Sequence, residues 1–224
     1  MLRAFANLGF RWKIALPIML LAILLVSMGA LGMRGITQVA DSSTKLTNRF
    51  LPGISLLLNA DRDLYQAFVA ERSLLDEGAG AHAEALTASH SENIQQAYER
   101  VHKFADMQPG REAMQLVAEF DKGFEQWKAT SQKVLQLATS DPQAASELSF
   151  GGSEEQFESM RTAIDKLGEM DDAAANAEGL AAIRLGETLS WQQGVIIAIG
   201  LGVCLVLVAD STLTRTPIPR TSGQ

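Results

Sequence analysis

The sequence is poor in several residue types that define common classes of protein. It has one cysteine, Cys204, so the chain forms no internal disulfide. Acidic residues outnumber basic ones, and the formal net charge is −7. A nucleic-acid surface needs the opposite, because clustered lysine and arginine must displace the counterions of the phosphates. These shortages exclude a disulfide framework and lead us to expect no nucleic-acid partner.

Catalytic and metal-binding motifs are also missing. We find no glycine-rich phosphate loop, no nucleophile elbow and no H-E-x-x-H sequence. The three histidines, His82, His90 and His102, are spaced by eight and twelve residues, which does not make a metal pair on a helix. The acidic pairs Glu154–Glu155 and Asp171–Asp172 are expected to be solvated helix charges. We therefore predict a protein that is not an enzyme and that needs no metal or cofactor.

Two almost wholly apolar blocks stand out. The first, residues 14–33, contains no charge and has the ~20 residues that a membrane-spanning helix requires. The alternative is a cleaved signal peptide, for which Arg3, Arg11 and Lys13 would supply the basic region. The block is longer than a signal core of ~7–15 residues, and no clear cleavage site follows before Arg34, so we predict an uncleaved span.

The second apolar block is predicted to be another span, at residues 191–210. It begins with Trp191, an interfacial residue type, and runs without a charge until Asp210. The alternative is a buried core helix, which its length and lack of charge disfavour.

Basic residues flanking the two blocks predict the topology. Three precede the first block, and Arg215 and Arg220 follow the second. The positive-inside rule then places residues 1–13 and the short tail 211–224 in the cytoplasm. Residues 34–190 lie outside, and the simplest setting is the periplasm of a Gram-negative inner membrane.

The segment between the blocks has a helical apolar period throughout and almost no strand signal. It predicts four helices, over residues 34–75, 81–107 and 110–139, with a fourth that begins within 143–155 and continues into the second span. Pro52–Gly53 is expected to bend the first helix. Gly151–Gly152–Ser153 is expected to start the fourth, with Ser153 as its N-cap. Trp127 and His90 fall on apolar stripes and are expected in the core.

Helix lengths predict the architecture. The first and last helices rise about 60 Å at 1.5 Å per residue, and the middle two are shorter. Short connections make neighbouring helices antiparallel, which gives an all-α, up-down-up-down four-helix bundle. The first and last helices would be continuous with the spans. Because two helices alone would expose an apolar seam below the bundle, we expect a homodimer in contact with membrane lipid.

One local stretch carries a resemblance to a known family. Phe50–Ile54 (FLPGI) followed by Asn59–Ala67 (NADRDLYQA) resembles the first helix of bacterial methyl-accepting chemotaxis proteins with a four-helix-bundle sensor domain. The likeness covers roughly residues 10–215. It implies a periplasmic receptor that binds small molecules, or ligand-loaded periplasmic binding proteins, and passes the signal across the membrane by a small piston-like step. Sensor histidine kinases and diguanylate cyclases share the architecture and remain an alternative.

The tail departs from that family. Leu213–Ile218 resembles the entry to a HAMP domain, but Pro217 and Pro219 would stop a helix there. The methylation helices and the kinase-coupling tip of the family do not follow. We therefore expect a truncated receptor, and a non-signalling membrane-anchored remnant is a further alternative.

The resemblance points to arginines as ligand-binding residues. Arg62, Arg72 and Arg161 fall on the first and last helices, where such receptors grip carboxylates bidentately. Arg62 falls where such receptors have an arginine. The pattern continues five and nine residues further on, where this sequence has Ala67 and Glu71, so it departs from the pattern of amino-acid recognition.

Asp61 and Tyr65 complete the candidate set. Asp61, like Glu71, falls on the apolar stripe of the first helix, where a carboxylate is costly unless it is paired. It could face a ligand amine, pair across a dimer, or reach water at the edge of the stripe. The alternative for the arginines is a solvated residue paired with a local acid such as Asp61, Asp63 or Glu71.

Overall fold

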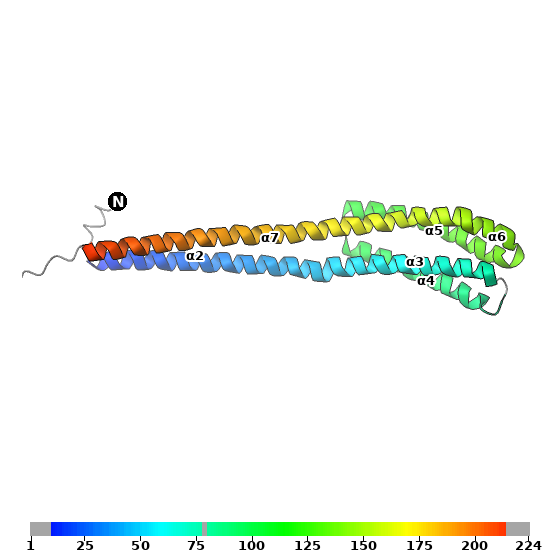
Figure 1. Cartoon of the computed structure of the whole chain (residues 1–224), viewed down its shortest axis with the longest axis horizontal. Helices are drawn as coiled ribbons and strands as arrows, with labels where there is room; N and C mark the ends of the chain where they lie inside the picture. Colours follow the sequence, from blue (N-terminus) through cyan, green and yellow to red (C-terminus); the bar gives the residue numbers. More distant parts are fainter. Residues whose placement is uncertain (1–9, 78–79, 214–224) are drawn as a thin grey trace, which may run out of the picture. The chain divides into compact units, whose positions relative to one another are not determined.

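The computed structural model describes residues 10–77 and 80–213, and all regular structure in these ranges is helical (Figure 1). The elements, in chain order, are α2 (Phe10–Lys45), the π-helical turn η1 (Leu46–Phe50), α3 (Leu51–Glu77), α4 (Ala83–Met107), α5 (Arg111–Ser140), α6 (Pro142–Leu148), the π-helical turn η2 (Ser149–Ser153) and α7 (Glu154–Leu213). The predictions for residues 1–9 and for the tail beyond Leu213 lie outside the described residues, as do residues 78–79 between the first two predicted helices.

The predicted all-α four-helix bundle is confirmed. It occupies residues 43–178, one of the two compact units of the chain, and consists of α3, α4, α5 and the α6–η2–α7 segment. Its core is aromatic, with Phe104, Phe120, Trp127 and Phe157 fully buried. The Phe68 and Phe157 rings stack with centroids 4.3 Å apart, which joins α3 to α7. The predicted burial of Trp127 and His90 is also confirmed, because 0% and 1% of these residues are exposed.

The second unit consists of residues 1–42 and 179–224 and contains the two apolar blocks. Within it α2 and α7 approach closely, since a Cβ added to Gly35 would lie 2.8 Å from Leu189 Cδ1. Each of the two helices contains an 18-residue apolar window of which none is buried. Both helices are therefore long and apolar enough to cross a membrane, and the first and last helices of the bundle continue into them.

Two local predictions need correction. The first long helix is interrupted at η1, ahead of Pro52–Gly53, where the Leu51 amide bonds to the Leu46 carbonyl in an i→i−5 pattern. The last helical segment begins earlier than predicted, at Pro142, and its N-cap is Asp141, whose Oδ1 accepts from the Ala144 amide at 3.1 Å. Ser153 is not an N-cap, because Gly151–Gly152 lie within η2 and the chain stays helical there.

Candidate functional site

Three of the five predicted binding residues come together on α3 and α7. The Arg161 guanidinium contacts both oxygens of Asp61, with Nε–Oδ1 at 2.6 Å and Nη2–Oδ2 at 3.3 Å. It also lies over the Tyr65 ring, 4.3 Å from the centroid, and bonds Glu158 at 3.1 Å. The hydrogen bond that Arg161 donates to Asp61 raises the pKa of the guanidinium, so this side chain carries a permanent charge. Asp61 already occupies the bidentate face that a ligand carboxylate would need.

A groove of about 390 Å³ runs between α3 and α7 beside this cluster. Its walls are partly apolar and partly acidic, and they consist of Ile54, Leu57, Leu58, Asp61, Ile164, Asp165, Gly168, Glu169 and Asp172. Four carboxylates along one groove disfavour an anionic ligand by Coulomb repulsion. Within residues 10–77 and 80–213, no group of three or more acidic, histidine or cysteine side chains is placed to hold a metal ion.

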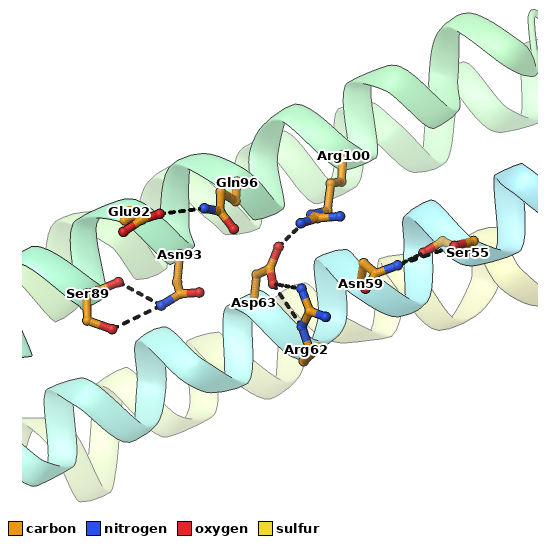
Figure 2. A network of polar contacts seen from close by, with 9 residues as sticks. All are labelled: Ser55, Asn59, Arg62, Asp63, Ser89, Glu92, Asn93, Gln96 and Arg100. Carbon is orange, nitrogen blue, oxygen red and sulfur yellow. Dashed lines mark hydrogen bonds and ion pairs between the residues drawn. The ribbon is translucent and has the colours of Figure 1, made fainter.

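Arg62 lies in a different place, beside Asp63 at the contact between α3 and α4. Its Nη2 is 2.8 Å from Asp63 Oδ1, and Arg100 Nε of α4 is 2.6 Å from Asp63 Oδ2 (Figure 2). Asp63 is fully buried, and its two oxygens face one arginine each. The remaining polar contacts in Figure 2 stay within a single helix, Asn59 with Ser55 in α3, and Asn93 with Ser89 and Gln96 with Glu92 in α4. Asp63 therefore joins the two helices electrostatically.

Arg72 lies in a third place, nearer the end of α3. Its guanidinium is sandwiched between the Phe68 and Phe150 rings, 4.3 Å and 4.2 Å from their centroids. Its Nη2 also bonds Glu154 at 2.9 Å, which connects α3 to the start of α7. The five predicted residues thus occupy three positions around the bundle. At each of them the arginine is paired with a carboxylate of the same chain, the alternative that the sequence left open.

Glu71, the other carboxylate on the apolar stripe of the first helix, does not reach water at the edge of the stripe. It is fully buried, and it accepts hydrogen bonds from the hydroxyls of Ser131, Ser149 and Ser153, the last two at 2.5 Å and 3.0 Å. Burial raises the pKa of this carboxyl, although the three hydroxyls oppose the shift. His90 Nε2 lies 2.7 Å from Ser131 Oγ. Since the Ser131 hydroxyl is donated to Glu71, His90 donates to the serine oxygen. Burial lowers the pKa of His90 to about 4, which favours the neutral imidazole at neutral pH.

Asp171 was expected to be solvated and is also fully buried. Its Oδ1 accepts a hydrogen bond from Gln108 Nε2, and Gln108 Oε1 in turn accepts from Arg49 Nε at 3.0 Å. Burial raises the pKa of Asp171 to about 6, against the lowering effect of Arg49. This chain of contacts joins η1, the loop after α4, and α7.

Sequence reasoning missed these two buried networks for a simple reason. The apolar stripes place single polar residues such as Glu71 and His90 toward the core but do not show which polar residues of other helices pair with them. The usable signal was a set of small hydroxyl residues at core positions, Ser131 between Trp127 and Val134, and the Ser149–Ser153 pair spaced by four. Such residues within a stripe indicate a buried polar partner on a neighbouring helix.

Comparison with known proteins gives one match. Residues 7–184 match the model of a family described as a four helix bundle sensory module for signal transduction. Searches of curated proteins and of solved structures give no match. The family match covers most of the chain and agrees with the bundle described above. A module of this kind is a sensor domain that is not catalytic in itself. The chain therefore belongs to the family of four-helix-bundle sensory modules for signal transduction.

Proposed function

We propose that the chain is the sensory part of a methyl-accepting chemotaxis receptor in the bacterial inner membrane. It binds a small molecule, or a ligand-loaded periplasmic binding protein, outside the membrane and transmits the event inward. The observation that carries the proposal is α7, which runs from Glu154 in the bundle to Leu213 without a break and contains the second apolar block. A continuous helix transmits a displacement of one end to the other, because its backbone hydrogen bonds make it stiff.

The proposed topology has two spans, with the bundle in the periplasm and both termini in the cytoplasm. It is testable because Cys204 is the only cysteine. In a Cys204→Ser background, a cysteine at Thr87, exposed on α4, should react with a membrane-impermeant maleimide in spheroplasts. A cysteine at Arg3 should react only after permeabilisation. Labelling of both positions, or of Arg3 alone, in intact spheroplasts would contradict the topology.

We propose that the active form is a homodimer, which a stripe on α3 supports. Leu51, Leu58, Tyr65 and Val69 are spaced by seven, seven and four residues and are between 40% and 66% exposed. Such heptad spacing along an exposed stripe favours packing against the helix of a second subunit. In the Cys204→Ser background, Leu58→Cys should form an intermolecular disulfide in membranes. Gln132→Cys, at an exposed position of α5, is the matched control. Equal cross-linking of both variants would contradict the interface.

We propose the α3–α7 groove as the place where ligand acts, with Asp61, Tyr65 and Arg161 at its end. Arg62 belongs to the proposed binding set only through its family position, and Arg72 only through its place on the first long helix, since they contact Asp63 and Glu154 instead. The groove has partly apolar walls between two helices that both continue toward the apolar blocks. A ligand that pushes these two helices apart or draws them together would therefore act directly on α7, the helix proposed to transmit the signal.

A chimaera tests the function. Residues 1–213 would be fused to the HAMP and signalling regions of a chemotaxis receptor, and kinase control would be measured in cells during a screen of amines, amino acids and organic acids. We expect at least one compound class to change kinase activity. Gly168 lines the groove, and nothing lies within 4 Å of a Cβ added there. Gly168→Phe should therefore fill the groove and abolish the response. Ala129→Phe, exposed on α5, is the control.

The outcomes of the screen separate the proposal from its alternatives. A response that survives Gly168→Phe would move the ligand site away from the groove. A chimaera that couples to the kinase but responds to no compound would favour the remnant. If the fusion responds only when it carries the output domain of a histidine kinase or a diguanylate cyclase, the chain would instead be the sensor part of a protein of that class.

A further inference from the structure

The two π-helical turns occupy matching places in the bundle. η1 (Leu46–Phe50) precedes α3, and η2 (Ser149–Ser153) precedes α7. In each, an amide bonds to a carbonyl five residues back, Leu51 to Leu46 and Glu154 to Ser149. A π-turn holds one more residue than an α-helical turn. Each turn therefore offsets the helix before it by about 100° relative to an uninterrupted α-helix.

The sequence explains why the turns form where they do. Pro52 has no amide hydrogen, so the carbonyl of Asn48 lacks its usual i→i−4 donor, and the hydrogen-bond pattern changes just ahead of it. Gly151 and Gly152 lie inside the second turn, and glycine accepts an altered backbone at low steric cost. Neither cause fixes the π form uniquely, because a helix can also continue in α geometry before a proline and through glycines. Something else must hold the turns.

A buried carboxylate of α7 holds the first turn. Arg49, within η1, donates to Gln108, and Gln108 donates to Asp171. The bundle is built to admit this carboxylate, because a Cβ at Gly53 would lie 3.2 Å from Asp171 Oδ2 and 3.3 Å from Phe104. Return of η1 to α geometry would rotate Arg49 around the helix axis by about 100°, the angle of one residue. This rotation would break its contact with Gln108.

A buried carboxylate of α3 holds the second turn. Ser149 and Ser153, the first and last residues of η2, donate to the two oxygens of Glu71. Phe150, inside the same turn, covers Arg72 of α3. The clamps are therefore reciprocal, because Asp171 lies on the helix that follows η2 and Glu71 lies on the helix that follows η1. They lie far apart, since 18 residues separate Ser153 from Asp171, about 27 Å of helix.

We propose that η1 and η2 are register switches, each held in its π form by a buried carboxylate of the opposite long helix. Opening the Arg49–Gln108–Asp171 clamp lets η1 convert to α geometry, and α2 then turns by about 100° relative to α3. A displacement of α7 that opens the clamp thereby causes α2 to rotate. The two helices that contain the apolar blocks then move together. The physiological use of the switch rests on the proposed sensory function, whereas the clamp itself is testable in the chain alone.

The experiment measures the rotational phase of α2 in the full chain, reconstituted in nanodiscs. Single cysteines introduced at positions 34–45, in the Cys204→Ser background, would carry spin labels whose accessibility to a polar relaxant varies with helical period. We expect Gln108→Leu, which cuts the clamp without changing charge, to shift this phase by about one residue. Gln115→Leu, an exposed glutamine on α5, should leave it unchanged.

A deletion separates the switch from general loosening. Removing Asn48 leaves the flanking helices in their present phase but without a π-turn. Gln108→Leu in this background should therefore cause no shift. A shift that persists after the deletion, or no shift from Gln108→Leu in the undeleted chain, would overturn the proposal. Should Gln108→Leu unfold the bundle, Arg49→Gln removes the other end of the clamp at an exposed residue and must give the same phase shift. A chimaera that responds to ligand without any phase change would retain the proposed function and reject the switch.

Discussion

Arg161 of α7 and Asp61 of α3 form a two-point ion pair at the edge of the acidic groove. The distances are 2.6 Å and 3.3 Å, and the side chains are 16% and 27% exposed. Partial burial makes such a pair stronger than an exposed one, because less solvent screens it. The pair links the first and last helices of the bundle at the place where we propose that ligand acts.

The first prediction concerns the strength of this pair. Asp61→Asn and Arg161→Gln should each destabilise the full chain in detergent by about 1–3 kcal/mol, the range for hydrogen bonds to charged groups. A double-mutant cycle from urea unfolding should give a coupling energy of at least ~1 kcal/mol. The Lys128–Glu125 pair, at 3.7 Å and largely exposed, is the control and should couple by less than about 0.5 kcal/mol. Equal coupling in both cycles would contradict a structural role for Arg161–Asp61.

The second prediction concerns Trp127 in the core. It is fully buried, and its indole nitrogen has no hydrogen-bond partner in the part of the chain that the structure describes. Trp127→Ala should cost about 3–5 kcal/mol through the cavity it leaves. Trp127→Phe should cost much less, since it keeps most of the apolar contact and loses an unpaired donor. Urea unfolding of both variants checks this, and similar losses would indicate a hidden partner for the indole.

The sequence predicted the bundle because apolar period, breaks and helix lengths all agreed with one topology. Helix ends were predictable to a few residues, as the observed Ala83–Met107 and Arg111–Ser140 show. The π-turns were not predictable, because their hydrogen bonds depend on partners from other helices, such as Gln108 and Glu71. The candidate site could be predicted only in part from the sequence. Asp61 was one of several acids considered as partners of the arginines, but its pairing with Arg161 depends on the relative rotation of α3 and α7, which no local pattern contains.

The third prediction concerns Glu71. Glu71→Ala leaves three serine hydroxyls without their acceptor and opens a cavity, so it should destabilise the chain by about 2–5 kcal/mol. Glu71→Gln keeps the shape and one acceptor oxygen and resembles the protonated acid that burial favours. Its cost should be clearly smaller. Thermal unfolding followed by circular dichroism at neutral pH checks the order, and a glutamine variant as unstable as the alanine one would mean that the carboxylate charge is required.

The fourth prediction uses the close approach of α5 and α7 at Gly123. A Cβ there would lie 3.2 Å from the Met160 Cα, which is backbone and cannot move aside as a side chain does. Gly123→Ala should therefore destabilise by about 1–3 kcal/mol through overpacking. Gly168→Ala, in open space within α7, is the matched control and should stabilise by up to ~1 kcal/mol from helix propensity. Stabilisation by both substitutions would show that the helices separate readily at this point.

The fifth prediction is a pH dependence that originates at His90. Burial lowers its pKa to about 4, from an ordinary value of 6.5. The unfolded chain therefore binds the proton more readily than the folded one between these two values. Stability from His90 is fully present above pH 6.5 and is lost as the pH falls toward 4, by up to about 3 kcal/mol at 1.36 kcal/mol per pKa unit. The loss is measured as the difference between wild type and His90→Gln in urea unfolding of the full chain between pH 4 and 7.5.

Asp171 has the opposite sign and provides the control for that experiment. Its pKa is raised to about 6, so the folded chain binds this proton more readily, and the contribution of the neutral carboxyl is lost as the pH rises through 6. The two shifts are similar in size, so they largely cancel and the wild-type profile should be shallow. His90→Gln should gain stability as the pH falls from 6 to 4, whereas Asp171→Asn should lose stability over the same range. The double variant should be as shallow as the wild type. Parallel pH profiles for wild type and His90→Gln would mean that His90 gains a proton without leaving the core, and that the neutral donor to Ser131 is not required for the fold.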